Sequence, residues 1–352
     1  MNKLLAQIAR LTSSITLKPD QVGKLPAYQF IAGRGAPFSI FSGPGLAWWK
    51  TKDSTRAMEA LIGMLISSSP EFIDCDTESV NKIIHETLQQ ICLDSPLFNG
   101  DDVVFATKEN LFECKGAVTV QEFCEIILAE IKKNLRNIIG ERCTIHPLPR
   151  FKGPSLSLPS ERLHLIACDD PTAWDMILEK QYNLDGWSPN SPFTKSSGFG
   201  FNSIENYNYI LFAEEHGTQK GAKFSSSIKF RMMTAVIFAF ASEAYPYRYH
   251  KSIAQPFTTC LQFPHRNFKN TNIHSSDCGA LSPFFTSDIE LSVDLLNNVE
   301  LWYTSLNACP KEYKQRILKS AHFLNRGMNA DDIESYINYF VALDALFGSA
   351  AP

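Results

Sequence analysis

The most informative stretch of the sequence is residues 329–348, which read Asn329-Ala-Asp-Asp-Ile-Glu-Ser-Tyr-Ile-Asn-Tyr-Phe-Val-Ala-Leu-Asp-Ala-Leu-Phe-Gly348. Asp331 can cap the N-terminus of a helix, Glu334 follows it at capping-box spacing, and Gly348 is a typical C-terminal stop. Apolar residues recur at helical spacing on one side: Ile333, Ile337, Phe340, Val341 and Phe347. The pattern predicts an amphipathic helix over 331–347.

One carboxylate lies on the apolar side of this helix. Asp344 follows Phe340 by four residues and precedes Phe347 by three, so all three share one face. A buried, ionised and unpaired carboxylate is costly, so we expect a cationic or hydrogen-bonding partner opposite it. Asp344 is therefore a candidate site residue, and the alternative is a structural carboxylate that orders a helix bundle.

Two segments near the C-terminus carry a family resemblance. Tyr339-Phe-Val-Ala-Leu-Asp-Ala-Leu-Phe-Gly348, preceded by Arg316-Ile-Leu-Lys-Ser-Ala-His-Phe-Leu-Asn-Arg326, resembles the middle of an Apea-like HEPN domain. Members usually show an ALEALF-type helix after a helix with an Arg-Ala-Leu pattern, and here Asp344 replaces the usual Glu. The resemblance covers residues 290–348. It implies an α-helical bundle of the kind used by bacterial RNA-cleaving toxins and phage-defence effectors.

The resemblance also implies a catalytic pair, an Arg and a His spaced four to six residues apart on a later helix. No such helix follows Gly348, so we expect either a fragment of a longer protein or a member without the usual catalytic element. Arg316 and His322 fit the spacing but precede the helix that contains Asp344. A His of near-neutral pKa can deprotonate the 2′-hydroxyl of RNA while an Arg stabilises the phosphate. Arg316 and His322 are therefore candidate catalytic residues, and the alternative is a solvated helix face.

Two classes of function remain open. The first is an RNA-targeting bacterial defence or toxin-type effector, a metal-independent endoribonuclease by resemblance, in which residues 1–286 sense an unknown trigger. The second is a non-catalytic sensing or interaction protein that uses the helical section for dimerisation. HEPN domains generally pair across a two-fold axis, so the resemblance implies a homodimer in both cases. RNA is the expected partner in the first class.

The composition is that of a globular cytoplasmic protein. The chain has 352 residues, of which 44% are apolar, enough to bury a sizeable core in two or three domains. Its net charge of −4 argues against a wholly basic nucleic-acid binder. Nine cysteines without a Cys-x-x-Cys pair favour a reducing compartment. The N-terminus lacks the apolar run of a signal peptide, and the most apolar window, residues 232–241, is too short to cross a bilayer.

We predict an α+β fold in four sections. They are an α+β N-terminal domain at 1–146, a Pro-rich connection at 147–159, an α+β middle region at 160–286, and a partial HEPN-like helical section at 287–352. The connection contains Pro147, Pro149, Pro154 and Pro159, which leave little room for regular structure.

Periodicity and capping residues place the main elements inside these sections. In the N-terminal domain we expect helices at about 54–68 and 78–93, and a third that begins at Thr119 and ends at Gly140. In the middle region, 163–168 and 207–213 have strand composition. The helical section is expected to contain helices at about 289–307, 312–325 and 331–347.

Three other patterns give weaker predictions. His265, His274 and Cys278 can bind zinc only with a fourth ligand from elsewhere, so we predict no metal and no cofactor. Gly33-x-Gly35 and Gly198-x-Gly200 lack the rest of a phosphate-binding signature and indicate turns. Trp48-Trp49 and residues 245–250, which include Arg248, can stack on bases, and a half-buried sheet edge explains them as well.

Overall fold

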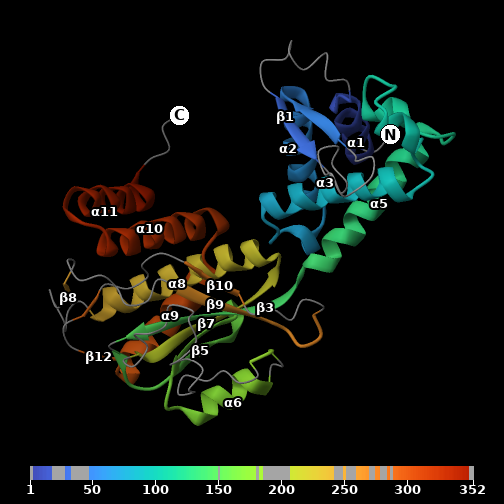
Figure 1. The fold of residues 1–352 in the computed structure, drawn as a ribbon. Coiled ribbons are helices and arrows are strands. Elements are labelled where there is room, and N and C mark those ends of the chain that lie inside the picture. Colours follow the sequence, from blue (N-terminus) through green and yellow to red (C-terminus); the bar gives the residue numbers. More distant parts are fainter. Residues whose placement is uncertain are drawn as a thin grey trace. The chain divides into compact units, whose positions relative to one another are not determined.

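The computed structural model describes most of the chain, and its residues fall into two compact units, Met1–Ile139 and Gly140–Pro352 (Figure 1). The described residues are 3–17, 28–32, 47–149, 151–179, 182–184, 207–241, 249–250, 259–268, 274–277, 284–285 and 288–348. Helices and a mostly antiparallel set of strands confirm the α+β fold that the sequence predicts.

The first unit is built from helices around one core. These are α1 (Lys3–Ser14), α2 (Lys52–Ser68), α3 (Thr77–Asp94), α4 (Gly100–Val104) and α5 (Val120–Ile138), with an antiparallel hairpin of β1 (Tyr28–Ala32) and β2 (Ala47–Thr51). Asp76 and Thr119 begin α3 and α5, because their side chains accept hydrogen bonds from the backbone N–H groups of Ser79 and Glu122. The three helices predicted for this part of the chain are confirmed.

The boundary between the units follows α5 and does not lie in the Pro-rich stretch 147–159. That stretch contains regular structure: β3 (Gly140–Pro149) includes Pro147 and Pro149, and β4 (Phe151–Lys152) and β5 (Leu156–Leu158) follow. Strand β3 pairs with β9 only from Arg142 to Ile145. Pro147 and Pro149 lie beyond that ladder, so their missing N–H groups remove no hydrogen bond to β9. The expectation of an irregular connection there was wrong.

The second unit contains a six-stranded antiparallel sheet with the strand order β10-β9-β3-β7-β6-β5. Besides β3 and β5, its strands are β6 (Leu163–Ala167), β7 (Tyr207–Gly217), β9 (Thr259–Pro264) and β10 (His274–Asp277). Two small pairs accompany it: β4 runs parallel to β12 (Ile289–Glu290), and β8 (Tyr249–His250) runs antiparallel to β11 (Phe284–Phe285). The predicted strands at 163–168 and 207–213 correspond to β6 and β7.

Alternate residues of β7 face opposite sides of this sheet. Leu211 and Ala213 pack in a core with α8 (Gln219–Ala241) and α9 (Val293–Ala308). Ile210 and Phe212 pack in a second core with Tyr182, on the side where α6 (Pro171–Glu179) lies. Figure 1 shows α8 and α6 on opposite faces of the sheet.

The apolar window at 232–241 forms the second half of α8, a helix longer than the sequence suggested. Among the described residues, α8 is the one helix long and apolar enough to cross a membrane, but 56% of its apolar window is buried inside the unit. Met233 and Ile237 are fully buried against the sheet. This is the environment of a core helix.

A buried histidine on β3 should make the stability of the second unit depend on pH. Burial, with Arg231 nearby, lowers the pKa of His146 to about 3. As the pH falls, the imidazole is therefore protonated in the unfolded chain before it is protonated in the folded chain. Stability is lost as the pH falls below about 6.5, and the loss is complete near the folded pKa. We expect His146 to contribute a loss of about 2 kcal/mol between pH 7 and pH 5. Urea unfolding should show a weaker pH dependence for His146→Gln, and equal dependence for the two chains would contradict this.

Candidate functional site on the C-terminal helices

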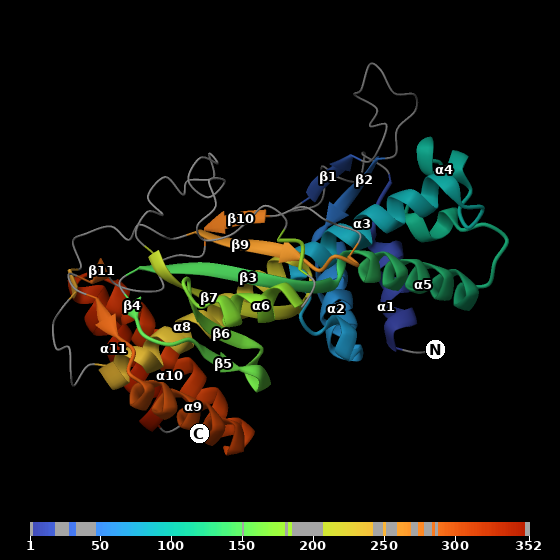
Figure 2. The same cartoon turned by 90° about the horizontal axis from the view of Figure 1, so that it is seen from below.

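Helices α10 (Lys311–Asn329) and α11 (Asp332–Phe347) form an antiparallel hairpin and lie side by side in both views (Figures 1 and 2). The helices predicted at 312–325 and 331–347 are confirmed. Asp331 begins α11, but its side chain makes no capping hydrogen bond. At the other end, the Gly348 N–H donates to the Asp344 carbonyl at 2.7 Å, and Arg316 Nη2 donates to the Gly348 carbonyl at 2.8 Å.

The side of α11 that packs on its neighbours is made of small and polar residues. Ser335, Asn338 and Ala342 are buried, and Ser335 Oγ donates to the Gly327 carbonyl of α10 at 2.7 Å. Gly327 permits this close approach, because a Cβ at that position would overlap the Tyr339 ring. Hydrogen bonding and close backbone contact therefore hold α11 in place.

The opposite side of α11 exposes large apolar side chains. We call this set the apolar face of α11: Ile333, Tyr336, Ile337, Phe340, Leu343 and Phe347, each between 53% and 80% exposed. Helical geometry places these six on a stripe about 120° wide. The sequence predicted that this side would be buried within the chain, and the structure shows the reverse.

Asp344 lies on the same side as this apolar face, as predicted, but the side chain is exposed. The desolvation cost that the sequence suggested therefore does not arise. Asp344 is one turn from Gly348, where Arg316 binds the last carbonyl of the helix. The structure thus brings Arg316 and Asp344 to the same end of the hairpin.

His322 is on another side of α10. It follows Arg316 by six positions, which corresponds to about 120° around the helix. His322 is half-buried, and burial together with the charges of Arg231 on α8 and Arg326 lowers its pKa. Within one chain, the predicted pair is therefore not assembled: Arg316 binds the end of α11, and His322 lies half-buried on another side of α10.

A polar contact between α8 and α10 lies close to His322 and was not predicted. Asn325 is fully buried, accepts a hydrogen bond from Arg231 Nη1 at 3.0 Å, and donates to Thr234 Oγ1 at 2.7 Å. Such a contact between distant segments leaves no local pattern in the sequence. It fixes the α10–α11 hairpin against the core helix of the unit.

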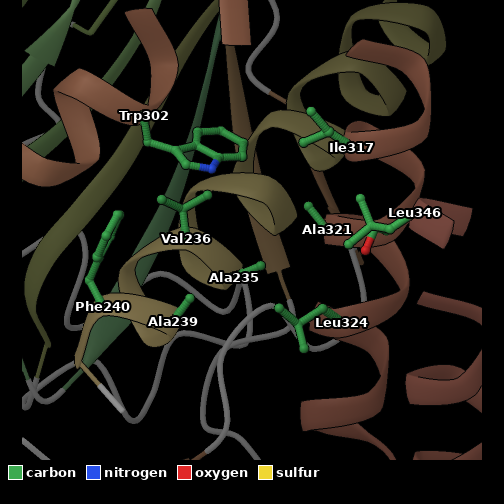
Figure 3. A pocket seen from close by; sticks show the side chains of 10 residues that line it. Ala235, Val236, Ala239, Phe240, Trp302, Ile317, Ala321, Leu324 and Leu346 are labelled. Carbon is green, nitrogen blue, oxygen red and sulfur yellow. The ribbon is translucent and has the colours of Figure 1, made fainter. Parts of the chain in front are cut away.

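An apolar hollow of about 340 Å³ lies beside the hairpin, among α8, α9, α10 and α11 (Figure 3). Ser320 is the one polar residue among those that line it, which are Ala235, Val236, Ala239, Phe240, Trp302, Ile317, Ser320, Ala321, Leu324 and Leu346. Leu346 belongs to α11 and precedes Phe347 of the apolar face. The hollow and the C-terminal end of that face are therefore neighbours.

The weaker sequence predictions fall elsewhere. His265 follows β9 and lies edge-on to Tyr182, His274 lies in β10, and Cys278 is outside the described residues. No group of three or more potential metal ligands occurs in the described part of the chain. The two Gly-x-Gly stretches and residues 245–248 are also outside it, and Trp48-Trp49 lie in β2.

No family model, curated protein or solved structure matches the chain. The resemblance to an Apea-like HEPN domain therefore remains a prediction that rests on residues 290–348.

Proposed function

We propose that this chain is a sensing or interaction protein in which the apolar face of α11 packs against the same face of a second copy. The observation that carries the proposal is the concentration of six large apolar side chains on the outer side of one helix. Scattered exposed apolar residues are ordinary, but a contiguous patch marks an interaction site.

The exposed area is of the order that a dimer interface needs. A standard interface buries about 800 Å² on each partner, and the six side chains, each more than half exposed, supply a large part of such an area. Much of this area comes from three aromatic residues: Tyr336, Phe340 and Phe347, the last residue of α11. Aromatic side chains are the residues that contribute most to interface energies.

The spacing of the apolar face is symmetric about Phe340, which favours an antiparallel pair. Ile333 and Phe347 are each seven residues from Phe340, Ile337 and Leu343 are each three, and Tyr336 and Asp344 are each four. In an antiparallel two-fold pair, each of these residues therefore faces the residue at the same distance on the other side of Phe340 in the second copy. The Tyr336 phenol can then donate a hydrogen bond to Asp344 of that copy.

Charge also favours the antiparallel arrangement. Helix α11 contains Asp332, Glu334 and Asp344 and no basic residue. A parallel pair would place the two Asp344 carboxylates next to each other, whereas the antiparallel pair separates them by about 12 Å along the axis.

The molar mass of the full chain in solution tests this proposal. Light scattering should give a mass approaching twice 39.5 kDa at micromolar concentration. A mass of one chain at all concentrations up to about 100 μM would contradict it, because an interface of this area is expected to bind more tightly.

We propose the RNA-targeting defence effector as a second candidate, because α10 is basic and carries an exposed aromatic residue. Its cations are Lys311, Lys314, Arg316, Lys319 and Arg326, against the single acid Glu312, and Tyr313 is exposed among them. Cations with an interleaved aromatic residue are typical of single-stranded nucleic-acid binding.

In both candidates we propose a cytoplasmic location, supported by the free state of the eight described cysteines.

A cleavage assay separates the two candidates. We expect no cleavage of a labelled tRNA and mRNA pool without added metal, because Arg316 binds the Gly348 carbonyl and His322 faces another side. Arg316→Ala, His322→Ala and Asp344→Ala should then behave as the parent chain does, as should the matched control Lys319→Ala. Cleavage by the parent that is lost in Arg316→Ala and His322→Ala, but kept in Lys319→Ala, would establish the effector.

A further inference from the structure

Four polar side chains lie in a row on the face of the sheet opposite α8. Ser157 on β5 and His164 on β6 are paired in register, and Ser157 Oγ lies 2.9 Å from His164 Nδ1. His164 Nε2 lies 3.7 Å from Oε2 of Glu214 on β7. Oε1 of Glu214 accepts a hydrogen bond from the Tyr182 hydroxyl at 3.0 Å.

The innermost members, Tyr182 and Glu214, place a carboxylate beside the imidazole. Burial, followed by the charge of Glu214, raises the pKa of Tyr182. The phenol therefore stays protonated and donates a hydrogen bond to Oε1 of Glu214. The second carboxylate oxygen, Oε2, lies 3.7 Å from His164 Nε2, beyond hydrogen-bond distance, and Nε2 has no hydrogen-bond partner among the described residues. A carboxylate at Nε2 favours the tautomer with the proton on that nitrogen. Nδ1 is then free to accept the Ser157 hydroxyl proton.

The members differ in their access to solvent. His164 is 1% exposed and Glu214 7%, whereas Ser157 is exposed. Strand β5 is the last in the strand order of the sheet, so a substrate can approach the hydroxyl from outside. An accessible hydroxyl, a base behind it and a carboxylate that orients the base are the components of an activated serine.

We propose that Ser157 is a nucleophile for acyl esters, with His164 as its general base and Glu214 and Tyr182 as positioning residues. Ser157 Oγ attacks the ester carbonyl carbon while its proton passes to His164 Nδ1. The alcohol leaves with that proton, and the acyl group stays on Ser157. Water then attacks the acyl-serine, gives its proton to His164, and releases the acid with regeneration of the hydroxyl. This site is independent of the apolar face of α11.

A fluorophosphate diester tests the nucleophile directly, because serine displaces fluoride from phosphorus and forms a stable phosphate ester. The full chain should acquire the adduct on Ser157 after treatment with diisopropyl fluorophosphate, as located by peptide mass spectrometry. Ser160, exposed on the turn that follows β5, is the matched control and should remain unmodified. Ser157→Ala should abolish labelling without disturbing the core. No adduct on Ser157, or equal labelling of Ser160, would overturn the proposal.

The positioning residue has its own test. In Glu214→Gln the amide can donate to Nε2, which moves the imidazole proton to Nδ1 and removes the base. We expect labelling of Ser157 to slow by about 100-fold or more. Glu214→Asp, which keeps the acceptor, should recover part of the rate. Melting curves establish that each variant is folded, and an unchanged labelling rate in folded Glu214→Gln would show that Glu214 does not orient the base.

Discussion

Replacing Phe340 by aspartate is expected to convert the proposed dimer into a monomer. Phe340 is 63% exposed and lies at the centre of the apolar face of α11, where the proposed two-fold axis passes. The change removes an aromatic contact and brings two carboxylates together in a desolvated position. We expect association to weaken by about 100-fold or more, equal to about 3 kcal/mol. Light scattering on a dilution series of Phe340→Asp and of the parent chain measures this shift.

The matched control is Phe105→Asp. Phe105 is 69% exposed, so it tests the same chemical change, but it follows α4 in the first unit and is not on the apolar face. Its mass should equal that of the parent chain. The account is wrong if Phe340→Asp dimerises as tightly as the parent, or if Phe105→Asp lowers the mass equally.

Replacing Gly153 by alanine is expected to cost the second unit about 3 kcal/mol of stability. Gly153 follows β4 with a φ of 132°, a conformation that only glycine adopts without strain. A Cβ there would also overlap the carbonyl oxygen of Leu291. The Leu291 N–H donates to the Lys152 carbonyl at 2.6 Å, and the Tyr209 hydroxyl donates to the Gly153 carbonyl. These hydrogen bonds hold the backbone of both Leu291 and Gly153 in place.

Urea unfolding measures this loss, and Gly63→Ala is its control. Gly63 lies within α2, and a Cβ there would meet nothing within 4 Å. Alanine is the better helix former, so Gly63→Ala should raise stability by about 0.5–1 kcal/mol. A Gly153→Ala chain as stable as the parent would show that the backbone at this position can relax.

Local signals predicted most of the elements. Thr119 and the apolar periodicity after it predicted α5, and the same kind of pattern predicted α10 and α11 within a few residues. Strand composition predicted β6 and β7. Capping and periodicity depend on residues close in sequence, so they are readable without the fold.

The packed side of α11 depended on a residue from another helix. Hydrophobicity selects the side with Phe340, but Ser335 and Ala342 pack instead, because Gly327 of α10 permits close approach. Likewise, Pro147 is tolerated because the β3–β9 ladder stops at Ile145. These are long-range contacts, and a single sequence does not specify them.

The candidate sites were only partly predictable. Arg316 and Asp344 were each placed on a predicted helix, but the sequence did not show that Arg316 would bind Gly348, one turn from Asp344. Ser157 and His164 were missed because their proximity depends on strand register. Registers of neighbouring strands are fixed by the assembled sheet.

A cysteine at the proposed two-fold axis tests self-association through the apolar face of α11. After mild oxidation, Phe340→Cys should give a disulfide-linked species of twice 39.5 kDa on a non-reducing gel. Ile333→Cys should not, because an antiparallel pair places its two copies about 21 Å apart. The parent chain measures the background from native cysteines. Cross-linking of both variants would indicate a parallel pair, and no cross-link of Phe340→Cys above background would contradict self-association through the apolar face of α11.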